Sequence, residues 1–205
     1  MMKILSVEKY KGSTYRIDFE EREPAFINNE IISLYHLKAG VEIPDEAWEE
    51  IVYANDFRRA RERALYLLDY RDYSYIELYK KLLANYDEQI CYDVCDKLAE
   101  LGLINDRRYA ESLARKYMEV KKFGYYRASR EMREKGLSKE LIDEALSQYE
   151  DSVIERICQL VEKKYLKKLE QEDGVKKVKN ALVRQGYSYS DINAALEQLF
   201  EEWEE

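Results

Sequence analysis

The 205-residue sequence has little proline, glycine or cysteine, and it has a single histidine. Two prolines and seven glycines leave few points at which a helix must end, which favours long helices over a sandwich of short strands. One histidine and three cysteines leave almost no material for a zinc site. Because free cysteine is usually a small buried side chain, we interpret Cys91, Cys95 and Cys158 as core residues in a reducing compartment.

The sequence also lacks long apolar runs. No run of 18 or more apolar residues occurs, and the apolar stretch at the N-terminus is too short for a secretory signal. We therefore expect a cytoplasmic protein that has no contact with a membrane.

Signatures of catalysis are missing as well. The sequence contains no dinucleotide-binding GxGxxG motif, no Walker loop and no GxSxG nucleophile turn. His36 has no partner at the spacing of a catalytic triad, and the carboxylates are scattered over helix surfaces. We expect a protein that is not an enzyme, with no catalytic residues, no metal and no cofactor.

Residues 1–55 differ in pattern from the rest of the chain. Two alternating stretches, 3–10 and 14–20, flank a turn and predict a β-hairpin, and residues 24–27 can add a third short strand. A helix is expected over 28–40, with Asn29 as its N-cap and Gly40 past its end, and a second helix opens at Asp45. With six cations against eleven anions, this is a small acidic α+β module.

From residue 56 onward the apolar positions have helical spacing, and the pattern repeats with a shift of about fifty residues. Equivalent positions hold Tyr75, Tyr125 and Val175, then Leu78, Ala128 and Val178, then Leu82, Met132 and Leu182. A three-helix unit buries little surface alone, whereas stacked units share a continuous core. We therefore predict a mainly α fold of three tandem three-helix repeats, at 56–105, 106–150 and 151–205, which form an elongated, curved array.

In each repeat a short turn is expected to join the second helix to the third. Residues that can adopt the left-handed conformation end the second helices, namely Asn85, Gly136 and Gly186. Natural N-caps for the third helices follow them, namely Asp87, Ser138 and either Ser188 or Ser190.

Although the net charge of the chain is -8, its middle segment is basic, because residues 106–135 hold ten cations against five anions. In the first helix of this repeat Arg108, Arg115 and Lys122 recur every seven residues, opposite the apolar stripe. In the next helix Arg127 and Arg130 are expected to face away from the core. Such exposed cations suit a nucleic-acid backbone, because each phosphate contact releases counterions.

Other cations extend this set along the chain. The candidate contacts with nucleic acid or a nucleoprotein filament are Arg58, Arg59, Arg108, Arg115, Lys121, Lys122, Arg127, Arg130, Lys163 and Lys164. Lys176–Lys179 form a further candidate. The alternative interpretation is that the interleaved acids, such as Glu111 and Glu131, leave these charges merely solvated or paired.

Three stretches resemble the signatures of the RecX family, bacterial regulators of the RecA recombinase. The matching residues of the first stretch are Arg71, Ser74, Glu77-Leu78 and Lys81-Leu82. Those of the second are Gly102, Asn105-Asp106 and Tyr109-Ala110, and those of the third are Lys122–Gly124 and Lys135-Gly136. In one departure, Tyr125 stands where the family usually has a proline.

This resemblance covers residues 56–200 and implies tandem three-helix repeats. It also implies a protein that binds in the groove of the RecA filament on single-stranded DNA and inhibits recombinase activity, with a role in recombination, DNA repair and the SOS response. We expect the protein to be a monomer. The N-terminal module resembles the extension of longer Gram-positive members.

Two other classes of function remain open. A helix-turn-helix regulator that reads DNA sequence would need base-reading side chains at the start of a recognition helix, but residues 87–95 and 138–146 are acidic there. A helical scaffold for protein partners, with its cations merely solvated, would show no salt-dependent binding to single-stranded DNA.

Overall fold

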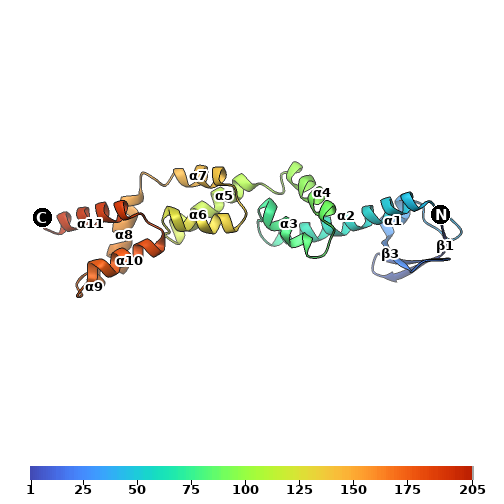
Figure 1. The fold of residues 1–205 in the computed structure, drawn as a ribbon, viewed down its shortest axis with the longest axis horizontal. Helices are drawn as coiled ribbons and strands as arrows, with labels where there is room; N and C mark the ends of the chain where they lie inside the picture. Colours follow the sequence, from blue (N-terminus) through green and yellow to red (C-terminus); the bar gives the residue numbers. More distant parts are fainter. Residues whose placement is uncertain (205) are drawn as a thin grey trace. The chain divides into compact units, whose positions relative to one another are not determined.

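The computed structural model describes residues 1–204, and most of the chain is helical (Figure 1). These residues divide into two compact units. The first unit holds Met1–Arg71 and Leu78–Leu101, and the second holds Asp72–Glu77 and the chain from Gly102 onward.

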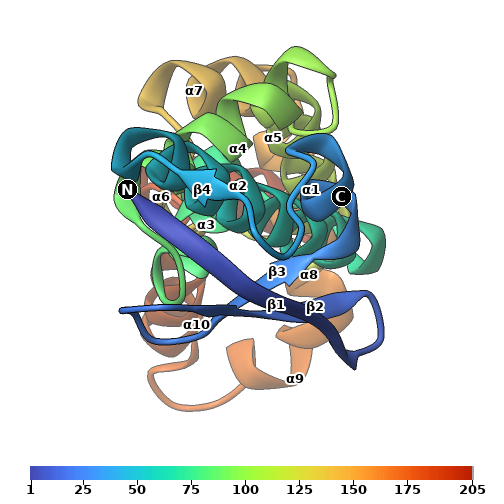
Figure 2. The same cartoon turned by 90° about the vertical axis from the view of Figure 1, so that its right-hand side faces the viewer.

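The N-terminal part of the first unit is an antiparallel four-stranded sheet. Its strands, in the spatial order β3-β2-β1-β4, are β1 (Met2–Lys11), β2 (Thr14–Phe19), β3 (Ala25–Asn28) and β4 (Glu42–Ile43). Helix α1 (Asn29–Leu34) and the start of helix α2 (Asp45–Tyr70) cover one face of the sheet (Figure 2). Ile4 and Ile17 from the sheet meet Trp48 from α2 in the core. The predicted hairpin and third strand are confirmed.

The helix expected over 28–40 is shorter than the sequence pattern suggested. Its N-cap is Asn28 and not Asn29, because the Asn28 side chain accepts a hydrogen bond from the Glu30 N–H at 2.9 Å. The helix ends at Leu34, and His36 then adopts the left-handed conformation with a φ of 53°. Gly40 belongs to a later turn, in which its N–H donates to the Ile4 carbonyl.

Helix α2 has 26 residues and runs without a break across the boundary expected between residues 55 and 56. No glycine or proline lies between its ends, so nothing in the sequence interrupts it. Its first half carries Trp48 and Ile51 into the core of the sheet, and its second half carries the buried Ala60 and Ala64. The division into a module and a first repeat at this point stays a prediction.

The remaining helices follow the predicted grouping by threes. The second half of α2 is followed by α3 (Tyr75–Leu83) and α4 (Glu88–Glu100). Next come α5 (Asp106–Arg115) with its π-helical continuation η1 (Lys116–Val120), α6 (Tyr125–Glu134) and α7 (Lys139–Ser147). The last group is α8 (Val153–Lys164), the short α9 (Leu166–Leu169), α10 (Gly174–Gln185) and α11 (Tyr189–Glu204). The mainly α fold with three-helix repeats is confirmed, whereas the curved array stays a prediction.

The turns between second and third helices agree with the prediction at two of three places. Gly136 and Gly186 are left-handed, with φ values of 81° and 95°. Asn85 is not among the left-handed residues of the described chain. Its N–H donates to the Leu82 carbonyl at 2.9 Å, as in a tight turn that continues the helix.

The expected N-caps of the third helices are all present. The side chains of Asp87, Ser138 and Ser188 accept hydrogen bonds from backbone N–H groups of α4, α7 and α11, at 2.9, 3.3 and 3.1 Å. Ser188, and not Ser190, therefore caps the last helix. Each cap satisfies a donor that the first helical turn leaves without a partner.

The three cysteines are free and buried, as expected of core side chains. Burial raises the pKa of the Cys95 thiol to about 12, which leaves it unreactive at neutral pH. None of the helices in residues 1–204 is both long enough and apolar enough to cross a membrane.

Candidate nucleic-acid interface

Two of the predicted cations, Arg108 and Arg115, lie on the exposed face of α5, as expected. Asn105 caps this helix by accepting from the Arg108 N–H at 2.9 Å, and Tyr109 and Leu113 carry its opposite face into the core. The two guanidinium groups are seven residues apart and thus two turns apart on one side. They can contact a polyanion without any change in the fold.

Carboxylates surround Arg115, however. A hollow of about 350 Å³ between α5 and α7 is lined by Arg115 and Arg107 and by three acids, Glu111, Glu119 and Glu144. Arg107 also forms an ion pair with Glu144. The local charge is therefore not basic, and a phosphate approaching Arg115 would meet glutamates as well.

Lys122 does not lie on the predicted stripe with Arg108 and Arg115. The π-helical turn η1 widens the helix after Arg115, so the seven-residue spacing no longer places Lys122 above Arg108 and Arg115. Lys122 instead lies in the following turn with a φ of 54°, and it is half-buried. Its carbonyl accepts a hydrogen bond from the Tyr187 hydroxyl at 3.0 Å, so its backbone contributes to packing.

Lys121 is exposed, and its ammonium group lies over two aromatic rings. The distances from its Nζ to the ring centroids of Tyr117 and Phe123 are 5.2 and 5.4 Å. Cation–π contact of this kind holds the ammonium near the protein surface, where a phosphate can still reach it.

Arg127 is only partly exposed to solvent, which corrects the expectation for α6. Its guanidinium carbon lies 3.9 Å from the centroid of the Phe123 ring, and its Nη1 donates to the Gln185 side chain at 3.3 Å. The side chain is only about one-third exposed, at 33%. Arg130 is exposed as predicted and lies 3.9 Å from Glu134. Arg127 is thus a packing residue, and Arg130 is the freer cation.

Arg58 is tied to carboxylates in the first unit. Its Nε lies 2.6 Å from Glu30 of α1, and its Nη2 lies 2.7 Å from Glu62 on its own helix. The hydrogen bond and the charge of Arg58 hold the pKa of Glu30 below its ordinary value. Arg59 is exposed, with Asp56 at 3.5 Å. Of this pair, Arg59 is the more available to a phosphate.

Lys163 and Lys164 are exposed at the C-terminal end of α8, as the sequence predicted.

Helix α10 carries a further set of cations, which the sequence pattern gave only as a secondary candidate. The sequence does contain a signal that favours α10 as a nucleic-acid contact, because no acidic residue occurs between 174 and 185.

The last two repeats interlock through backbone contacts. The Gly124 N–H donates to the Gln185 carbonyl at 2.9 Å, and the Tyr126 N–H donates to the Gly186 carbonyl at 3.1 Å. A Cβ atom on Gly124 would lie 2.3 Å from the carbonyl carbon of Gly186, so only glycine fits there. The turn that follows α10 is therefore seated on the start of α6.

An equivalent contact lies one repeat earlier, still within the second unit. The Ser74 hydroxyl donates to the Lys135 carbonyl, and a Cβ atom on Gly136 would lie 2.7 Å from the Ile76 side chain. Lys135 also pairs with Glu77 at 3.1 Å. The two contacts are alike: the turn after α10 packs against the start of α6, and the turn after α6 packs against the start of α3.

Three family models match the chain in consecutive order. The first three-helix domain of RecX matches residues 60–98, the second matches 105–146 and the third matches 150–196. The chain belongs to the RecX family.

Relatives in the RecX family match almost the whole chain. The regulatory protein RecX of Streptococcus sanguinis (strain SK36) is 30% identical over 201 residues, which cover 97% of this chain and 77% of that protein. The regulatory protein RecX of Clostridioides difficile (strain 630) is 28% identical, with 98% of both chains covered.

Solved RecX structures have the same fold. The crystal structure of RecX from Lactobacillus salivarius superposes with a TM-score of 0.67 at 28% identity, covering 71% of this chain and 97% of that one. A second crystal structure of a regulatory protein RecX gives a TM-score of 0.73 at 24% identity, covering 96% and 100%.

Several residues of the RecX signatures contact one another although they are far apart in the sequence. Ser74 and Glu77 of the first signature contact the Lys135-Gly136 pair of the third. Asp106 of the second signature accepts the Tyr75 N–H at 2.8 Å, and burial raises the pKa of that carboxyl group. Tyr125, which replaces the usual proline, occupies the first position of α6, where proline is favoured but not required. These signature residues therefore connect segment 72–77 to the chain after Gly102 within the second unit.

Proposed function

We propose that this RecX-family chain is a cytoplasmic regulatory protein that binds RecA on single-stranded DNA and lowers its DNA-dependent ATPase activity. The observation that carries the proposal is the presence of three RecX domains in order, in a chain whose relatives are named regulatory proteins. The proposed partner is the nucleoprotein filament, and the proposed form of the regulator is a monomer.

The physical basis of regulation would be a difference in affinity between states of the recombinase. A ligand shifts an equilibrium only by as much as it binds one state better than another. A row of repeats offers one surface per repeat, so it can contact neighbouring subunits in a filament at once and dispersed subunits only singly. Exposed cations such as Arg108, Arg115 and Lys121 would contact DNA phosphates.

The test is a titration of the purified chain into RecA and single-stranded DNA, with ATP hydrolysis as the readout. We expect inhibition at equimolar or lower amounts. The double variant R108A/R115A should inhibit less, while circular dichroism shows an unchanged fold, because both side chains are exposed.

The matched control is K9A/K11A, which removes two exposed cations from β1 and should inhibit like the unmodified chain. No inhibition by the unmodified chain at large excess would refute the proposal. Equal inhibition by R108A/R115A and the control would show that α5 is the wrong surface.

The helix-turn-helix alternative is disfavoured by the third helices of the repeats. The first turns of α4, α7 and α11 carry acidic residues, Glu88, Glu140 and Asp191. Carboxylates at the start of a recognition helix would repel the phosphates on both sides of the groove. The scaffold alternative predicts an affinity for single-stranded DNA that is absent or independent of salt.

A further inference from the structure

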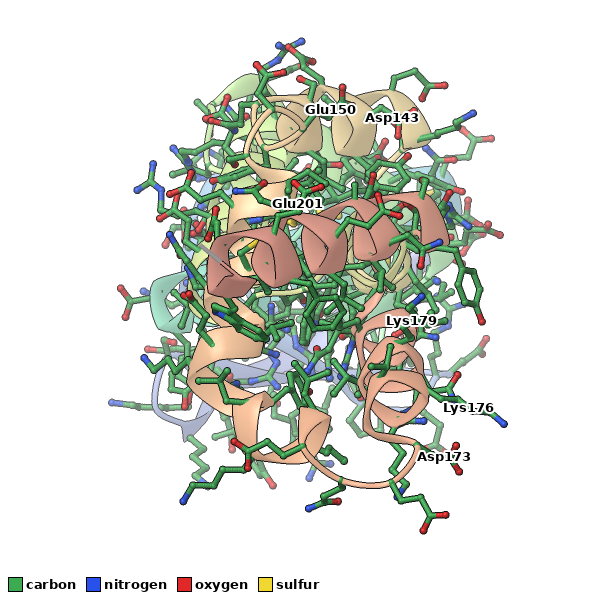
Figure 3. The ribbon with its side chains drawn as sticks, turned by 90° about the vertical axis from the view of Figure 1, so that its left-hand side faces the viewer. Asp143, Glu150, Asp173, Lys176, Lys179 and Glu201 are labelled. Atoms are coloured by element: carbon green, nitrogen blue, oxygen red, sulfur yellow. The ribbon has the colours of Figure 1, made fainter. Side chains whose placement is uncertain are left out.

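The third repeat has two neighbouring helices of opposite charge. Helix α10 carries four cations and no acid, namely Lys176, Lys177, Lys179 and Arg184. Residues 189–204, which form α11, carry five acids and no cation. Figure 3 shows Lys176 and Lys179 on one side of α10, with Glu201 on α11 away from them. The repeat therefore has one strongly basic side.

The cations of α10 are not neutralised within the described part of the chain. None of the ion pairs found in residues 1–204 includes a cation of this helix, whereas Arg58, Arg107, Arg127 and Arg130 each lie near a carboxylate. Lys177 donates to the Glu172 carbonyl at 2.8 Å, which uses its ammonium group without cancelling the charge. Val178 and Leu182 hold the opposite face of α10 in the core, which fixes the basic face outward.

A hollow beside α10 adds aromatic and amide groups to this charge. It has a volume of about 540 Å³, and its lining includes Lys176, Lys179 and Asn180 of α10, Tyr189 of α11 and one acid, Asp173. The three α10 residues lie at positions i, i+3 and i+4 and so share one face. The Tyr189 side chain is 62% exposed, although tyrosine usually packs against the fold.

We propose that this α10 face, defined as Lys176, Lys179, Asn180 and Tyr189, binds single-stranded nucleic acid, with phosphates on the two lysines and an unpaired base stacked on Tyr189. The proposal rests on the proposed function and names the surface that contacts DNA. Stacking on an exposed aromatic ring needs a base that is not already in a duplex, which selects the single strand. The hollow is large enough for one nucleotide, and the Asn180 amide can reach a base edge.

The α10 face therefore adds a nucleic-acid contact in the third repeat to those proposed for the exposed cations of the second repeat. In the second repeat Lys122 and Arg127 take part in packing, and glutamates surround Arg115. On the α10 face no carboxylate lies between the lysines in sequence, and Asp173 is the one acid among the residues that line the hollow, so two lysines there stand against one carboxylate.

The experiment measures fluorescence anisotropy of a labelled thymidine 20-mer with the full chain, without recombinase, over a series of salt concentrations. We compare the unmodified chain, K176A/K179A, Y189A and the charge-matched control K9A/K11A. Each phosphate contact contributes about 0.7 to the salt slope for a single strand, so K176A/K179A should lower the slope by about 1.4. Loss of one stacked base should weaken binding about 5- to 150-fold in Y189A.

The control should bind like the unmodified chain, and a duplex of equal length should bind more weakly than the single strand. No measurable binding by the unmodified chain, or a slope unchanged in K176A/K179A, would overturn the proposal. Equal binding of duplex and single strand, with Y189A unaffected, would overturn the stacking of a base on Tyr189.

An ATPase assay with the recombinase separates this inference from the proposed function. If K176A/K179A binds DNA normally but no longer inhibits, the α10 face contacts an acidic protein surface and the inference is wrong. If the unmodified chain never inhibits but its DNA binding depends on Lys176 and Lys179, the proposed function is wrong and the inference stands.

Discussion

The contact between Gly124 and Gly186 allows a sharp test of how the last two repeats are held together. Gly124 has a φ of -80°, which any residue can adopt, so replacing it with alanine adds a steric effect and no backbone strain. The new Cβ would lie 2.3 Å from the carbonyl carbon and oxygen of Gly186 and 2.5 Å from the Tyr187 nitrogen. Carbon atoms normally approach to about 3.5–4.0 Å, so the turn after α10 must move by about 1 Å.

That movement breaks the two hydrogen bonds from the N–H groups of Gly124 and Tyr126. Each is worth about 0.5–1.5 kcal/mol, so G124A should lower the free energy of unfolding of the second unit by about 2 kcal/mol. For a chain of this size the Tm should fall by about 4–8 °C. Protection of the two amides from hydrogen exchange should fall about 30-fold.

The control is G102A, at a glycine in a left-handed turn. Gly102 has a φ of 70° and open space around its Cα, so alanine there costs about 1 kcal/mol of backbone strain but meets no neighbour. Exchange at Gly124 and Tyr126 should remain slow in G102A. If G124A keeps the Tm and the exchange protection of the unmodified chain, the repeats are not held by this backbone contact.

Two further predictions concern arginines whose partners lie far away in the sequence. Arg58 holds the pKa of Glu30 below 4.5, so this carboxylate stabilises the fold above that pH, and the contribution is lost as the pH falls through the lowered pKa. In R58A the pKa of Glu30 should rise towards the ordinary value of a glutamate in an NMR titration, and an unchanged low value would contradict the ion pair. R127A should lower the free energy of unfolding by about 1–2 kcal/mol, because it removes the cation–π contact with Phe123 and the hydrogen bond to Gln185. The matched variant R130A should cost less than about 0.5 kcal/mol in the same denaturation experiment, and equal losses would show that Arg127 is not a packing residue.

Much of the fold could be read from local patterns. The alternation before and after Gly12, the helical spacing after residue 56 and the caps Asp87, Ser138 and Ser188 each depend on neighbours a few residues away. Such features are set by backbone geometry and by the nearest turn, so a single sequence contains them. Where the prediction missed, as at Asn28 and Leu34, the error is one of helix ends, which the surrounding turns decide.

The sequence by itself determined that this chain consists of repeated helical triplets after a β-rich start, and which residues carry the family signatures. Only the tertiary structure decided which cations are free. Arg58 meets Glu30, which is 28 residues away, and Arg127 meets Gln185, which is 58 residues away. The π-helical turn after Arg115 also moves Lys122 out of line, because a period of 3.6 residues holds only while the helix stays regular. Counting charges along a helix does not identify partners that are distant in the sequence. Which charges remain exposed and unpaired is therefore decided only by the tertiary structure.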